Sequence, residues 1–152
     1  MDTTDGTIAA MTRHPRDHTS TVELADGTRW RLVPTGWGLI RAIEDGDEIA
    51  RITRRSWLGR HWDLTATTWH YRLTSDPMPR RWHVTVGDQV VARISGSLIS
   101  YNRVDIDAPI GVPLAATMLA WHVIARPWEA ASRPAGLIPV IEPAPRPAAG
   151  AA

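Results

Sequence analysis

The stretch RITRRSWLGRHW, from Arg51 to Trp62, holds the densest group of side chains that could recognise a ligand. Guanidinium groups bind phosphate oxygens through paired hydrogen bonds, and an indole ring is favoured at the boundary between water and lipid. A basic loop with a tryptophan therefore predicts binding of anionic phospholipid at a membrane surface. The residues assigned to this binding are Arg51, Arg54, Arg55, Trp57 and Arg60.

A structural interpretation of the same loop stays open. When the internal repeat described below is aligned, Trp57 falls on Ile99, which is also apolar. Both residues would then be core residues that cap the fold, and the arginines would only be solvated.

Other chemically suggestive groups carry weaker signals. His61, His70 and His83 fall on predicted outer faces, but the chain has no HExxH or comparable zinc spacing, so we interpret them as surface histidines. Ser56, His61 and Asp63 can be written as a catalytic triad, yet no strand–turn–helix elbow orients them. The carboxylates of residues 44–48 lie in a short turn rather than in a twelve-residue calcium loop.

Composition excludes several kinds of chemistry. The chain has no cysteine, and all 17 basic residues are arginine, which rules out thiolate ligands, a Schiff-base lysine and a P-loop lysine. A net charge of +1 gives no strong attraction to nucleic acid, so we expect no nucleic-acid partner. No cofactor motif is present, and the first residues contain no apolar signal segment, which favours a cytoplasmic protein.

Short segments of alternating polarity must position these groups. Turn residues such as Asp26-Gly27, Asp45-Gly46 and Gly87-Asp88 separate these segments. About ten segments of this kind predict an antiparallel β-barrel or sandwich. The alternation places Trp69 and Trp82 on the buried face.

Two of these segments repeat one another. IARITRRSWLGRHWDL, from Ile49 to Leu64, aligns without a gap with VARISGSLISYNRVDI, from Val91 to Ile106. We interpret the match as two copies of a hairpin with its returning strand, while coincidence between short β motifs remains the alternative. The repeat places Ala50 and Ala92 on one face, where small side chains would leave room for a large neighbour.

The segment PLAATMLAWHVIA, residues 113–125, is apolar on almost every side and predicts that neighbour. Proline suits its first position, and Arg126 and Pro127 mark its expected end. A helix of this length spans roughly 20 Å, short of a bilayer core of about 30 Å, so we favour a buried helix over a membrane span. His122 on this helix is interpreted as a core histidine, with a titratable functional group as the second interpretation.

The chain is thereby divided into three parts. Residues 1–20 are expected to form a disordered arm, residues 21–126 the β-barrel domain around the helix, and residues 127–152 a Pro/Ala-rich tail with one late strand at 137–141. The predicted core contains Ala50, Ala92, Trp62, Trp69, Trp82, Leu119 and Trp121.

Tryptophan-rich strands, the repeated [IV]-A-R-I hairpin and one hydrophobic helix near the C-terminus resemble the tubby C-terminal-like superfamily. That superfamily includes LURP-one-related proteins and phospholipid scramblases. The resemblance covers roughly residues 21–125 and implies a closed or nearly closed β-barrel around a central helix, with a phospholipid ligand.

We therefore expect a non-enzymatic module that binds anionic phospholipid and is peripheral to a membrane. The alternative is a protein-interaction or assembly module without a lipid role, and a third is an enzyme whose site has no recognisable motif. The oligomeric state is not encoded in any feature of the sequence.

Overall fold

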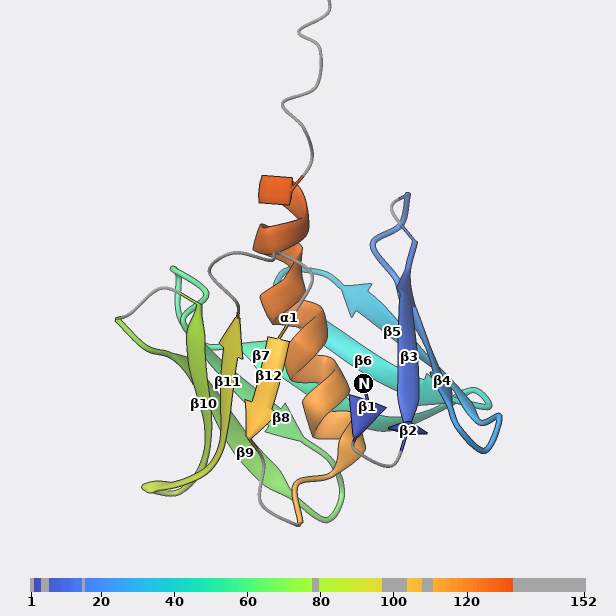
Figure 1. The fold of residues 1–152 in the computed structure, drawn as a ribbon. Coiled ribbons are helices and arrows are strands. Elements are labelled where there is room, and N and C mark those ends of the chain that lie inside the picture. Colours follow the sequence, from blue (N-terminus) through green and yellow to red (C-terminus); the bar gives the residue numbers. More distant parts are fainter. Residues whose placement is uncertain are drawn as a thin grey trace, which may run out of the picture.

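The computed structural model describes residues 2–3, 6–14, 16–77, 80–96, 104–107 and 111–132. These residues form strands joined by tight turns and one helix (Figure 1). The strands are β1 (Asp2–Thr3), β2 (Gly6–Thr7), β3 (Ala9–Arg13), β4 (Ser20–Leu24), β5 (Arg29–Thr35), β6 (Leu39–Glu44), β7 (Asp47–Arg54), β8 (His61–Thr65), β9 (His70–Ser75), β10 (Arg81–Val86), β11 (Gln89–Gly96) and β12 (Val104–Asp107). The helix is α1 (Leu114–Ser132).

The predicted mostly-β architecture is confirmed. Strands β3 to β12 form one 10-stranded antiparallel sheet in which every strand pairs with its neighbours in the chain, and β1 pairs with β2 separately. The sheet curves around α1 (Figure 1). Within the described residues no pairing joins β3 to β12, so the sheet is not closed and the expected closed or nearly closed barrel is not confirmed.

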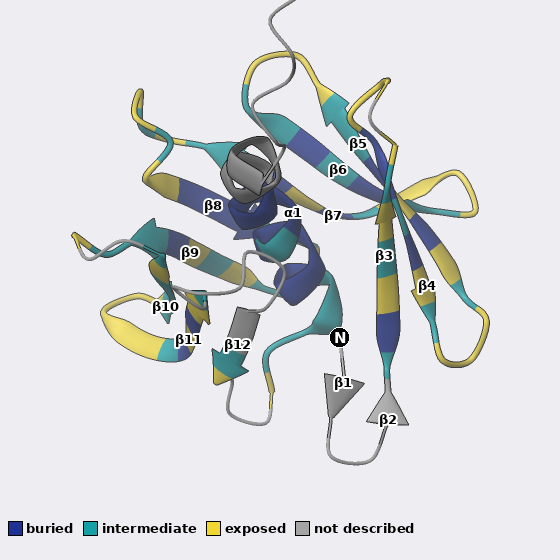
Figure 2. Ribbon diagram, turned by 45° about the horizontal axis from the view of Figure 1, so that its top comes forward, coloured by how far each residue is buried: buried dark blue, intermediate teal, exposed yellow. Residues whose placement is uncertain are grey.

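Alternating side chains fill the space between the sheet and the helix. Leu32, Ile52, Leu64 and Leu73 are fully buried on the inner face, whereas arginines such as Arg31 point to solvent. Buried and exposed residues alternate in bands along the strands around α1 (Figure 2). This two-residue period is typical of strands with one face buried and the other exposed to solvent.

The helix is longer than expected. It begins after Pro113, whose carbonyl accepts the backbone N–H of Thr117, and it continues to Ser132. The expectation that Arg126 and Pro127 end it is wrong, as is the assignment of residues 127–132 to the tail. Proline removes one backbone hydrogen bond, but the following WEAA segment favours helix and continues it. The late strand expected at 137–141 lies outside the described residues.

The N-terminal segment also differs from the expectation of a disordered arm. Residues 9–13 form β3 and pair with β4, with Ala9 buried at the edge of the core. The signal is weak in the sequence because Ala9 and Met11 are the only apolar inward residues of this strand.

The internal repeat is confirmed by the register of the sheet. Ala42 pairs with Ala50 and Val84 pairs with Ala92, and in both hairpins a β-bulge follows directly. The next strands repeat the pattern, because Ile52 pairs with Leu64 where Ile94 pairs with Ile106. Strands β6–β8 and β10–β12 therefore have the same register and the same bulge position, related by the same offset as Ala50 and Ala92.

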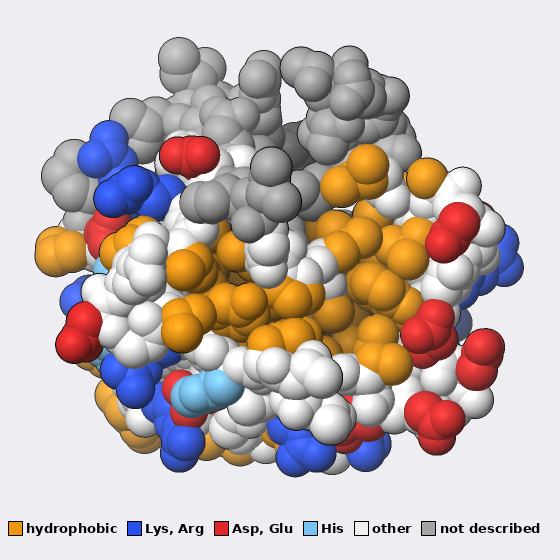
Figure 3. Space-filling model, turned by 90° about the horizontal axis from the view of Figure 1, so that it is seen from below, with side chains coloured by type: hydrophobic (Ala, Val, Ile, Leu, Met, Phe, Trp, Pro, Cys, Tyr) orange, Lys and Arg blue, Asp and Glu red, His pale blue; other side chains and the backbone are white. Residues whose placement is uncertain are grey.

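The helix starts at the lower end of the sheet, where Leu114 and Ala115 are half-buried and pack against the core. Seen from below, hydrophobic side chains cover the middle of this end and charged side chains surround them (Figure 3). In the part of the chain that the structure describes, no helix is long and apolar enough to cross a membrane.

Candidate functional site

Two neighbouring loops carry the most exposed large apolar side chains of the described residues. Trp37, on the β5–β6 loop, is 70% exposed, while Trp57 and Leu58, on the β7–β8 loop, are 82% and 68% exposed. We call residues 36–38 and 55–60 the tryptophan loops. Large apolar side chains in such positions mark a contact surface rather than a folding core.

Arg54 joins the two tryptophan loops. Its guanidinium carbon lies 4.7 Å from the ring centre of Trp37 and 5.9 Å from that of Trp62. Its Nε donates to the Ser56 carbonyl at 2.9 Å, and a terminal amino group donates to the carbonyl of Trp57. The guanidinium group of Arg54 is therefore occupied by contacts within the protein. Its stacking on indole rings and its hydrogen bonds to backbone carbonyls hold both loops in place.

The backbone next to Arg54 leaves no room for larger residues. Gly38 has a φ of +78°, and a Cβ added there would lie 2.6 Å from the Cβ of Arg54. The Gly38 carbonyl accepts the backbone N–H of Arg54 at 2.7 Å. Glycine is required because both the left-handed conformation and the close approach exclude a side chain.

The five residues predicted to bind lipid have different environments. Trp57 and Arg60 are exposed, and no described ion pair involves Arg60. Arg54 points inward, Arg51 is paired with Glu48, and Arg55 is paired with Asp63. Arg54 differs from the other arginines of this group because it alternates with Thr53, faces the same side as Ile52 and is half-buried.

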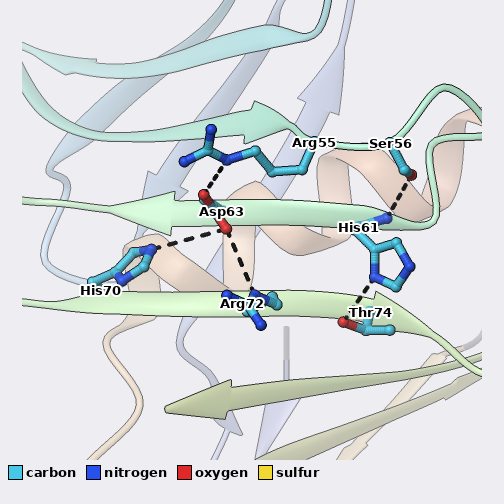
Figure 4. Close-up of polar contacts among 7 residues, drawn as sticks. All are labelled: Arg55, Ser56, His61, Asp63, His70, Arg72 and Thr74. Atoms are coloured by element: carbon cyan, nitrogen blue, oxygen red, sulfur yellow. Dashed lines mark hydrogen bonds and ion pairs between the residues drawn. The ribbon is translucent and has the colours of Figure 1, made fainter. Parts of the chain in front are cut away.

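Asp63 lies on the outer face of the sheet, yet its side chain is only 10% exposed. Arg55 pairs with Oδ2 of Asp63. His70 Nε2 and Arg72 Nε each lie 3.9 Å from Oδ1 of Asp63 (Figure 4). In the register of β7, β8 and β9, the outward positions around it hold only arginine, histidine and threonine. We name these residues the Asp63 ring: Arg51, Thr53, Arg55, His61, Thr65, His70, Arg72 and Thr74.

The residues of the triad written above have other partners. The Ser56 hydroxyl accepts the backbone N–H groups of Arg60 and His61, at 2.8 and 3.0 Å. The His61 ring approaches the Thr74 hydroxyl, and Asp63 contacts Arg55 (Figure 4). Ser56 therefore stabilises the turn of its loop and is not oriented by His61 as a nucleophile.

The histidines of the outer face do not converge. His83 lies opposite Thr74 in the β9–β10 register, and its Nδ1 contacts Asp76 at 2.7 Å. Among the residues that the structure describes, no three His, Asp or Glu side chains are arranged to hold a metal ion. The acidic residues 44–48 form the β6–β7 hairpin turn, and Glu48 there pairs with Arg41 and Arg51.

A shallow groove of about 530 Å³ lies over β10 and β11. Its charged lining consists of Arg81 and Arg93 together with Asp76 and Asp107, beside His83. Acidic and basic groups are balanced there, in contrast to the Asp63 ring.

Six of the seven predicted core residues lie in the core or pack against it: Ala50, Ala92, Trp62 and Leu119 are buried in it, and Trp69 and Trp82 are half-buried against it. Trp121 is half-buried and is not among the residues packed against the core. His122 is a core histidine, as expected: it is fully buried, its Nδ1 lies 2.9 Å from the Ser20 hydroxyl, and its carbonyl accepts a 2.7 Å bond from Arg13.

The sequence interpretation missed Trp37, Leu58, His70 and Arg72 as members of these surfaces. The motif Gly36-Trp37-Gly38 between two strands indicated an exposed turn, and Arg72 and Asp63 both alternate outward from adjacent strands.

No family model, no curated protein and no solved structure matches this chain.

Proposed function

We propose that this protein attaches to the surface of anionic membranes through the tryptophan loops. The supporting observation is the exposure of Trp37, Trp57 and Leu58 on two adjacent loops that Arg54 holds together. Tryptophan is suited to the headgroup region of a bilayer, and apolar groups already exposed in water insert without unfolding the domain.

In this proposal fewer arginines interact with the membrane than the basic sequence of the loop suggests. Arg60 is exposed on the same loop as Trp57 and contributes attraction to anionic headgroups, of about 1 kcal/mol for one arginine near the surface. Arg54 contributes indirectly, because it positions the indole of Trp37 and the backbone of Trp57. The proposal also includes a barrel-like scaffold, related to the tubby superfamily, that keeps the loops rigid.

Vesicle flotation tests the proposal. The variant W57S/L58S should lose more than tenfold in affinity for phosphatidylcholine–phosphatidylserine vesicles, because each large apolar side chain contributes roughly 1.5–3 kcal/mol when buried. R60Q should weaken binding to these anionic vesicles by about fivefold and should leave binding to pure phosphatidylcholine vesicles unchanged. V86S/V90S is the matched control, since Val86 and Val90 are exposed on the separate β10–β11 hairpin.

Flotation of W57S/L58S equal to that of the unchanged protein would contradict the proposal. Absence of flotation of the unchanged protein on the phosphatidylserine-containing vesicles would also contradict it and would favour a protein contact through the tryptophan loops. Their tryptophan and arginine content is also typical of the energetic centre of a protein–protein interface.

A further inference from the structure

We propose that the Asp63 ring binds an oxyanion of the phosphate monoester class. The ring lies on the outer wall of β7, β8 and β9 and does not include the exposed apolar residues of the tryptophan loops. Arg55 is the residue that the ring shares with the tryptophan loops, and the proposed site does not depend on the apolar side chains that attach to the membrane.

The positive groups of the ring exceed the negative ones. Arg51 is neutralised by Glu48, but Arg55 and Arg72 share the single carboxylate of Asp63. Two arginines against one carboxylate leave one net positive charge even when His61 and His70 are neutral. A phosphate monoester supplies the missing negative charge.

The burial of Asp63 explains why the arginines can still bind a ligand. Its carboxylate lies below Arg55 and Arg72, whose side chains remain 67% and 61% exposed. Arg55 contacts Asp63 through Nε, which leaves its terminal amino groups for another acceptor. A buried carboxylate that fixes a guanidinium group in this way reduces the entropy lost when the group binds phosphate.

The neighbouring side chains suit the tetrahedral shape of phosphate. His70 Nε2 and Arg72 Nε both lie 3.9 Å from the same oxygen of Asp63. Imidazole and guanidinium groups so placed can approach one phosphate from different directions, which a planar carboxylate ligand would use less completely. The groove over β10 and β11 offers no comparable excess of positive charge.

A titration of the full chain with inorganic phosphate tests the site. At constant pH and about 0.1 M chloride, NMR signals of the His70 ring and the Arg55 and Arg72 Nε–H groups should change and saturate. R72Q should weaken binding at least about tenfold and keep its fold, because Asp63 still pairs with Arg55. R29Q is the matched control, since Arg29 is an exposed arginine paired with Glu23 on β4.

The second variant, H70Q, tests the site if R72Q does not fold. Absence of saturation, or saturation that neither R72Q nor H70Q weakens, would overturn the proposal. W57S/L58S should keep the phosphate titration unchanged, so failure of membrane attachment and failure of this site are separate results.

Flotation on phosphatidylcholine vesicles with phosphatidic acid identifies the source of the phosphate. If R72Q reduces this flotation, the site accepts a lipid headgroup. If R72Q affects only the titration with inorganic phosphate, the site accepts a soluble phosphate ester. Either result supports the site.

Discussion

Arg54 ends strand β7 and Arg60 lies on the loop that follows it, but their surroundings give them different roles. Arg54 faces inward and contacts Trp37, Trp62 and two backbone carbonyls, whereas Arg60 is exposed. The residue type alone therefore does not decide which arginine can meet a ligand. The direction set by strand alternation and the backbone around each residue decide it.

Gly38 gives a direct test of the packing around Arg54. Gly38→Ala should destabilise the protein by at least about 1 kcal/mol more than Gly36→Ala, as measured by urea unfolding. Both glycines have positive φ, but a Cβ at Gly36 meets nothing within 4 Å, whereas at Gly38 it meets the Cβ of Arg54. Equal losses in the two variants would show that Arg54 is not held as described.

Asp26 provides a prediction about pH. The backbone N–H of Thr28, with a 2.9 Å bond to Asp26, and the Thr28 hydroxyl hold the pKa of Asp26 below its ordinary value. Because the folded pKa is lower than the unfolded one, this interaction stabilises the fold above about pH 4 and is lost as pH falls through the folded pKa.

Replacement of Thr28 by alanine should raise the pKa of Asp26 part of the way back, since the backbone N–H remains. A carboxyl ¹³C NMR titration measures this change. Asp17 serves as the internal control, because Thr19 lowers its pKa through the same kind of bonds and is not altered. A pKa of Asp26 that is the same in both proteins would contradict the assignment.

At the scale of elements, the repeated hairpins place small residues on the inner face. Ala42 and Ala50 pair across β6 and β7, and α1 packs most closely against β6, β7 and β8. Ala92 occupies the matching position of the second unit and is also buried. The repeat therefore places alanine in both units, but the helix lies nearest to the first.

Ala50→Leu should destabilise the protein by about 1–3 kcal/mol, because the added atoms have no space beside the helix. Ala92→Leu should cost less, since β11 lies farther from the helix than β7 does. Urea unfolding measures both, with Ala25→Leu in the exposed β4–β5 turn expected to stay within about 0.5 kcal/mol. A larger loss for Ala92→Leu would contradict the position of α1.

At the scale of the whole molecule, the sequence predicted the sheet except its first strand. Regular alternation and turn residues located β4 to β12, because one face of each strand had to be buried. Strand β3 was missed because its inward residues carry little apolar surface, and the helix end was missed because the helix-favouring residues after Pro127 outweigh the proline.

The candidate sites were harder to predict than the fold. The exposure of Trp57 depends on loop geometry, which has no period to read, and the contact between Arg54 and Trp37 joins loops that are separate in the sequence. The Asp63 ring depends on the register of three strands, which the sequence leaves undetermined until their turns are known.

Helix α1 follows every strand of the described sheet in the chain, yet it fills the concave side of that sheet. During synthesis on the ribosome, Leu32, Ile52 and Leu64 emerge before the segment that shields them from water. Until residues 114–132 have been synthesised, these apolar side chains lack the helix that covers them, and exposed apolar surface of this kind favours aggregation and recognition by chaperones.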